Sequence, residues 1–114
     1  MNVSIYLCLT VLSGLADGYG FSEASRIWRE GSPSVFAIVR SGIGYALGII
    51  LYWLALRFVN AAGVTSASVQ TLSWFVITII GVAVLSGDFK EWDVGAYMLA
   101  VVAIAAVAGL LIKA

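Results

Sequence analysis

The stretch LSGLADGYGFSEASRIWREG (residues 12–31) contains the point at which an apolar run gives way to a charged one. Asp17 lies within the apolar part, and the charged part begins six residues later at Glu23. The Asp17 carboxylate therefore lies either inside a membrane, as a working group, or near the point where the membrane ends. The composition of the whole chain decides first whether a membrane is involved.

The chain is too apolar to be a soluble domain. Its 114 residues are 62% hydrophobic and 11% charged, with a mean hydropathy of +1.06, whereas soluble domains carry about 25% charged residues. Six basic and six acidic residues cancel, which gives no electrostatic reason to expect a nucleic acid partner. With no histidine and one cysteine, the sequence excludes an intrachain disulfide and the usual metal sites. We expect an integral membrane protein that is not an enzyme and binds no metal or cofactor.

Four apolar runs predict four membrane-spanning helices, over residues 3–20, 35–58, 63–85 and 94–112. Each is close to the roughly 20 residues that cross about 30 Å of hydrocarbon, and in lipid a helix satisfies its own backbone polar groups. No basic residue precedes the first run, so we do not interpret it as a signal peptide. The connections are too short for a soluble module. We predict an all-α, four-helix transmembrane bundle that forms a single domain over residues 1–114, with both termini on one side.

Small residues at G-x-x-x-G spacing predict close helix packing. The pairs are Gly14 and Gly18, Gly44 and Gly48, and Ala105 and Gly109. They could pack within one subunit, or the small face of the last helix (Gly95, Val102, Ala106 and Gly109) could join two subunits. Four helices alone enclose little space, so we favour a homodimer or a paralogous heterodimer. The bias of Lys and Arg between the two sides is slight and is compatible with insertion in both orientations.

Asp17 and Arg40 are charged side chains within predicted helices, where such residues usually have a function or a partner. Asp17 could be interfacial, could pair with Arg40, or could bind a proton or a cationic substrate. Arg40 could extend to the interface or bind an anionic headgroup or substrate. Gly18 and Gly20 each weaken a helix by about 1 kcal/mol relative to alanine. We therefore predict that the first helix ends near Gly20. Asp17 would then lie near the membrane boundary and would not be a proton-coupling residue.

The third predicted helix is the most polar. Ser66, Gln70 and Ser73 share one face at i, i+4 and i+7, with Trp74 beside them. Serine often donates to a carbonyl of its own helix, so Gln70 is the residue that we most expect to line a cavity. Tyr45 could form an aromatic wall or simply pack. The predicted substrate-binding set is Gln70, Ser66, Ser73, Arg40, Asp17, Trp74 and Tyr45.

Several passages resemble the drug/metabolite transporter superfamily, especially its four-helix members of the small multidrug resistance type. They are FSEASRIW after a glycine-bearing first helix, Pro33-Ser34-Val35, LYWLALRFVNAAGVTSA (residues 51–67) and Leu85-Ser86-Gly87-Asp88. The chain is also similar to half of a longer transporter of the EamA type, in which Arg40 would match an arginine of the second helix. The resemblance implies a small transporter in a bacterial or archaeal cytoplasmic membrane, with membrane lipid as its surroundings.

The sequence departs from that family pattern in its first and third helices. Small multidrug exporters carry an essential glutamate midway along the first helix, where this chain has Ser13 and Gly14. The tryptophan of the family's third helix falls near Gln70. Four-helix relatives without the glutamate include subunits of lipid-linked sugar flippases. We expect a dimeric transporter or permease for a small organic or lipid-linked substrate; the alternative is a non-transporting accessory subunit of a larger complex.

Overall fold

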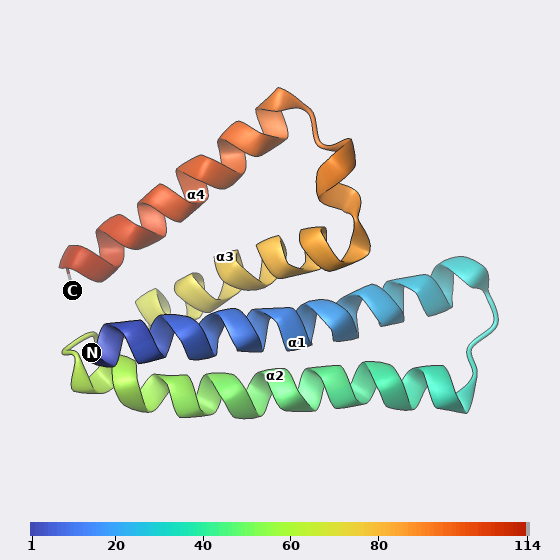
Figure 1. Cartoon of the computed structure of the whole chain (residues 1–114), viewed down its shortest axis with the longest axis horizontal. Coiled ribbons are helices and arrows are strands. Elements are labelled where there is room, and N and C mark those ends of the chain that lie inside the picture. Colours follow the sequence, from blue (N-terminus) through green and yellow to red (C-terminus); the bar gives the residue numbers. More distant parts are fainter. Residues whose placement is uncertain (114) are drawn as a thin grey trace.

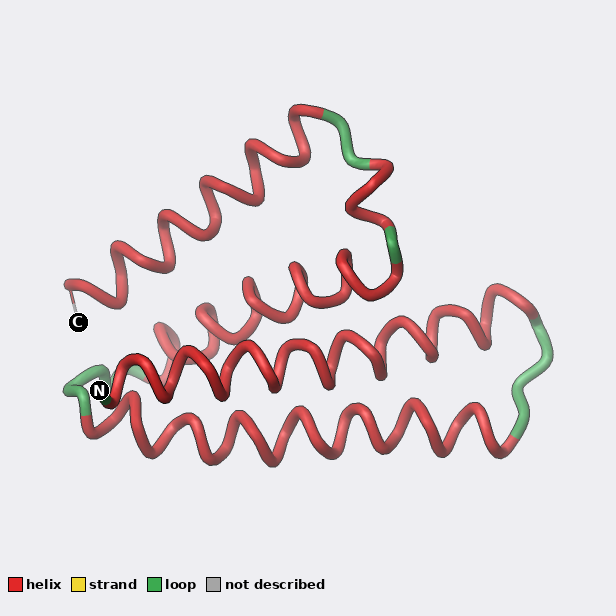
Figure 2. The backbone as a smooth tube through the Cα atoms, in the orientation of Figure 1, coloured by secondary structure: helices red, strands yellow, loops and turns green. Residues whose placement is uncertain are grey.

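Membrane-spanning α-helices make up nearly all of the protein. The computed structural model describes residues 1–113, which form α1 (Asn2–Glu30), α2 (Val35–Ala61), α3 (Ala67–Ser86), the short 3-10 helix η1 (Asp88–Glu91) and α4 (Val94–Lys113) (Figure 1; Figure 2). All four α-helices of the described chain are long and apolar enough to cross a membrane. The predicted all-α, four-helix architecture is confirmed, and the chain is an integral membrane protein.

The end of α1 lies ten residues beyond the predicted one. The helix continues through Gly20 to Glu30 and stops at Gly31, whose φ of 72° is left-handed. Glycine adopts this C-terminal cap without strain, and Pro33 shortly afterwards cannot continue a helix. The prediction that the first helix ends near Gly20 is therefore wrong. Gly18 and Gly20 lie inside the helix, where they allow close packing.

The other helix boundaries are closer to the predicted ones. α2 begins at Val35 as predicted, because the hydroxyl oxygen of Ser34 accepts a backbone N–H of the first turn at 3.1 Å. α3 begins at Ala67 and not at residue 63, because Ser66 is its N-cap. Helices commonly begin at such a serine, whose side chain satisfies a free N–H. Ser66 therefore precedes α3 and does not belong to its membrane-facing surface.

α1 is the central helix of the bundle. α2 runs antiparallel beside it, and α3 packs on another side of it (Figure 1). The helices approach closely at glycines: a Cβ at Gly18 would lie 2.8 Å from the backbone of Gly81, and one at Gly44 would lie 2.8 Å from the backbone of Gly20. Small residues permit such contacts in lipid, where dispersion replaces the hydrophobic effect. The interpretation of these G-x-x-x-G pairs as packing within one subunit is confirmed for α1 and α2.

α4 stands apart from the other helices. It packs mainly against α3 and diverges from it toward η1, and the last turn of α4 lies at the same end of the molecule as the first turn of α1 (Figure 1). Val107 is the one buried residue of α4 within the described chain. The small face of the helix (Gly95, Val102, Ala106 and Gly109) is exposed and is turned away from α3. This face is therefore not used for packing inside the subunit.

Candidate functional site

The candidate site lies on one buried face of α1. Buried residues recur there at alternating spacings of four and three, which places them along one side of a helix. They are Tyr6, Thr10, Ser13, Asp17 and Gly20. This side of α1 lies against α2, and Asp17 is only 2% exposed. The carboxylate is thus enclosed by protein and does not face lipid.

The Asp17 carboxylate lies against the backbone of α2 at Gly48. A Cβ built at Gly48 would overlap the carboxylate, so glycine is the residue that leaves room for it. One turn earlier on α1, the Ser13 hydroxyl donates to the carbonyl oxygen of Gly48 at 2.7 Å. The two helices are therefore fixed together at the level of the carboxylate.

This level is deep in the membrane. Gly48 lies eight residues after Arg40 and nine before Arg57, or about 12 and 14 Å along the helix. The charged residues thus bracket a stretch close to the roughly 30 Å thickness of the hydrocarbon, and Gly48 lies near its middle. The prediction that Asp17 lies near the membrane boundary assumed that α1 ends near Gly20, whereas the helix continues for 13 residues beyond Asp17 to Glu30.

α3 contributes a hydrogen-bond donor to the same point. The indole N–H of Trp74 donates to the Asp17 carboxylate at 3.2 Å and lies 3.3 Å from the Ser13 hydroxyl oxygen. The Tyr52 ring of α2 lies 6.0 Å from the Trp74 ring, and its hydroxyl donates to the Gln70 carbonyl oxygen. Three helices therefore meet at Asp17, although 57 residues separate it from Trp74.

Asp17 has no positively charged partner in the described part of the chain. Both ion pairs found there use the same carboxylate, that of Glu23, with Arg26 and Arg40. A pair between Asp17 and Arg40, one of the alternatives that the sequence left open, is therefore absent from residues 1–113. A carboxylate without a counter-ion is costly in a membrane interior, and one indole N–H compensates little of its charge. A bound proton or a cation would remove that cost.

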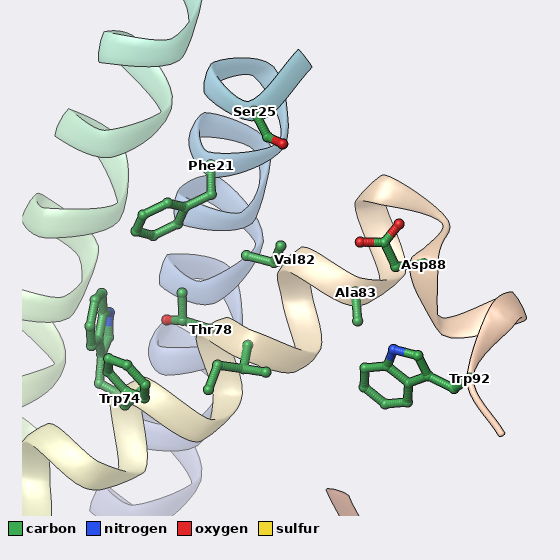
Figure 3. Close-up of a pocket in the computed structure, with 10 residues that line it drawn as sticks. Phe21, Ser25, Trp74, Thr78, Val82, Ala83, Asp88 and Trp92 are labelled. Carbon is green, nitrogen blue, oxygen red and sulfur yellow. The ribbon is translucent and has the colours of Figure 1, made fainter. Parts of the chain in front are cut away.

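A groove of about 480 Å³ lies beside this site, between α1, α3 and the segment that begins at η1. Its lining is mostly apolar, and Trp74 belongs both to this lining and to the hydrogen bond with Asp17. Figure 3 shows Phe21 and Trp74 toward one end and Asp88 and Trp92 at the other. The Thr78 hydroxyl between them is buried without a hydrogen-bond partner among the described residues. The groove could therefore hold an apolar or aromatic body next to a carboxylate.

Two of the seven predicted binding residues meet: Asp17 and Trp74. Of the seven, Trp74 alone is among the residues that line the groove. Gln70 is 7% exposed, so the prediction that it faces inward is confirmed. However, its side-chain amide donates to the Val64 carbonyl oxygen at 2.8 Å, and it therefore fixes the connection between α2 and α3. Gln70 does not line the groove described above.

The remaining predicted residues also make structural contacts. Ser73 donates to a carbonyl of its own helix at 2.8 Å, and Ser66 caps α3. The Tyr45 ring packs edge-on against Phe21 at 4.9 Å between ring centroids. Arg40 pairs with Glu23 at the end of the hairpin, far along α2 from Gly48. These side chains stabilise the bundle around the site without belonging to it.

Sequence reasoning missed Ser13, Gly48 and Thr78. Ser13 is one turn from Asp17 on the same face, and Gly48 lies midway between two arginines. Both spacings are visible in the sequence, but only the pairing of α1 with α2 connects them. Nothing in the sequence identifies Thr78 as a site residue, except that it is a polar residue in an apolar run.

No family model matches the chain, and neither a curated protein nor a solved structure shows a significant match to it. The resemblance to the drug/metabolite transporters therefore stays a prediction.

Proposed function

We propose that this protein is a small membrane transporter that works as a dimer and carries an organic cation. Asp17 would bind either the cation or a proton, and the two would compete for it. The observation that carries the proposal is that the Asp17 carboxylate lies against Gly48 of α2, is 2% exposed and has no cationic partner among the described residues. Ionisable groups in such positions usually face a substrate or ion pathway.

The chemistry of the groove supports an aromatic or apolar cation as the substrate. Phe21, Trp74 and Phe75 line it, and aromatic faces attract cations as well as apolar groups. The Trp74 indole belongs to the lining of this space and also donates its N–H to the Asp17 carboxylate, which lies behind it. A bound organic cation could place its charge near Asp17 and its apolar body along the groove. Rocking of two subunits about their shared interface would then expose the site to each side in turn.

Reconstitution into liposomes tests the proposal. We expect that benzyltrimethylammonium, an aromatic cation that lipid alone excludes, dissipates an imposed pH gradient in liposomes containing the protein and not in empty ones. Asp17→Asn keeps the size of the side chain and removes its charge, so we expect the flux to fall at least tenfold. Asp93→Asn is the matched control, because Asp93 is exposed before α4, where asparagine also caps helices well. Wild-type flux in Asp17→Asn would contradict the proposal.

The exposed face of α4 favours one other function, that of an accessory subunit within a larger membrane complex. A helix whose small residues find no partner in its own subunit is suited to packing against another chain. Under this alternative the purified protein carries none of a panel of organic cations, whereas Asp17→Asn lowers the stability of the complex. Flux measurements and thermal unfolding of the same preparations separate the two functions.

A further inference from the structure

Three charged side chains form a cluster at the end of the α1–α2 hairpin that lies opposite the chain termini. One Glu23 carboxylate oxygen accepts a hydrogen bond from Arg26 at 2.6 Å and lies 3.4 Å from a terminal nitrogen of Arg40. The Glu23 side chain is 16% exposed, while those of the two arginines are 39% and 38% exposed. The carboxylate is thus held beneath two guanidinium groups that reach the surface.

The cluster carries an excess of positive charge and of hydrogen-bond donors. Two guanidinium groups share one carboxylate, and including the neighbouring Arg29 and Glu30 the excess is still one positive charge. Each guanidinium has five N–H donors, of which Glu23 engages few. The Nε of Arg40 is buried and has no hydrogen-bond partner in residues 1–113. An additional anion would satisfy donors that the protein itself leaves free.

The depth of the cluster matches the headgroup region of a bilayer. Arg40 lies eight residues from Gly48, so its Cα is about 12 Å from the middle of the span, just inside the hydrocarbon edge at about 15 Å. A long arginine side chain reaches from there to the phosphate level. Trp28, on the last turns of α1, is 77% exposed and is suited to the same interface.

The surface beside Arg40 is shaped for an acyl chain. The Phe36 ring centroid lies 4.9 Å from the Arg40 guanidinium carbon and restricts its orientation. Ile43 and Leu47 follow Arg40 at i+3 and i+7 on the same side of α2, and both are at least half exposed. A lipid whose phosphate lies at Arg40 would therefore find an apolar ridge leading toward the centre of the bilayer.

We propose that Arg26 and Arg40 bind the phosphate of an anionic phospholipid, whose acyl chain lies along Ile43 and Leu47. Guanidinium groups match phosphate oxygens in two-point hydrogen bonds. A zwitterionic lipid brings its own ammonium group and leaves the excess positive charge uncompensated, so an anionic lipid is preferred. Glu23 competes with the phosphate for the same guanidinium groups. This lipid site does not depend on Asp17 or on transport.

Lipid enrichment around the purified protein tests the site. The protein is placed in nanodiscs of phosphatidylcholine with 20% phosphatidylglycerol, and the lipids that remain bound on ejection are counted by native mass spectrometry. We expect enrichment of phosphatidylglycerol that falls about fivefold in Arg40→Gln, the factor for one basic side chain at an anionic surface. Arg57→Gln is the matched control at the other end of α2, where the described chain shows no ion pair, and it should keep the enrichment.

Glu23→Gln provides a second test whose expected result is a gain of lipid binding, which a folding defect would not produce. Removing the competing carboxylate frees both guanidinium groups, so we expect phosphatidylglycerol enrichment to rise at least twofold above that of the wild type. Unchanged enrichment in either Arg40→Gln or Glu23→Gln would overturn the proposal. Glycerol phosphate is then titrated into the same nanodiscs. Displacement of the lipid at low millimolar concentration would show a site for soluble anions and would also overturn it.

Discussion

The carboxylate of Asp17 on α1 occupies the space that a side chain would take at Gly48 on α2. The two helices can therefore pack closely at this point only because residue 48 is a glycine. This contact places a charged group near the middle of the membrane, against the backbone and beside the Trp74 indole. The position suits the proposed exchange of a proton for a cation, because no positively charged side chain among residues 1–113 pairs with the carboxylate.

Gly48→Ala is expected to displace the Asp17 carboxylate, because the new Cβ and the carboxylate cannot share one space. Overpacking of this kind costs about 1–3 kcal/mol, so both the stability and the cation flux should decrease. Gly42→Ala on the same helix is the control, since a Cβ there meets nothing within 4 Å. Thermal unfolding in detergent and the liposome flux assay provide the two measurements. Equal behaviour of the two variants would exclude the close Asp17–Gly48 contact.

Trp74→Phe should weaken cation binding about tenfold or more while leaving the fold intact. The phenylalanine ring keeps most of the apolar contact but loses the indole N–H that donates to Asp17, and a hydrogen bond to a charged group contributes about 1.5–3 kcal/mol. Trp53→Phe is the control, because Trp53 is 72% exposed on α2. Titration with benzyltrimethylammonium by isothermal calorimetry measures the effect. A similar change in both variants would show that the indole hydrogen bond has no role.

Gln70→Ala should destabilise the protein without changing its affinity for the cation. The substitution leaves the buried Val64 carbonyl oxygen without its donor, which costs about 1–3 kcal/mol. Thr71→Ala removes a hydroxyl that donates to its own helix on an exposed face, and its effect should stay within about 0.5 kcal/mol. Weaker cation binding at unchanged stability in Gln70→Ala would restore the interpretation of Gln70 as a cavity residue.

Cysteines on the small face of α4 should crosslink two subunits. In a Cys8→Ser background, we expect disulfide dimers from Val102→Cys and Gly109→Cys, because both positions are exposed and turned away from α3. Ile104→Cys is the control, since Ile104 lies beside α3 residues in its own subunit. Oxidation in native membranes followed by non-reducing electrophoresis measures the products. Dimers from Ile104→Cys alone would place the subunit interface elsewhere.

The four helices could be predicted from the sequence because the requirement is local. A segment of about 20 apolar residues must form a helix in lipid whatever surrounds it, so the starts at Val35 and Val94 were predicted correctly. The end of α1 was not, because Gly18 and Gly20 were interpreted as weakening the helix. In a membrane the same glycines allow helices to touch, and the stop signal is instead Gly31 followed by Pro33.

The amino-acid sequence by itself determined that this chain crosses the membrane as helices, that Asp17 is in the first of them, and that it has few other charges to pair with. Only the tertiary structure decided what surrounds that carboxylate. Its contacts with Gly48 and Trp74 depend on which helices pair and in which register, and neither is encoded in the spacing along one segment. The pairing of α1 with α2 also brings Arg40 to Glu23. Gln70, in contrast, donates to a carbonyl only six residues earlier, in the connection before α3. The surroundings of Asp17 therefore follow from its neighbours across helices, because in lipid a buried charged group depends on partners within the protein.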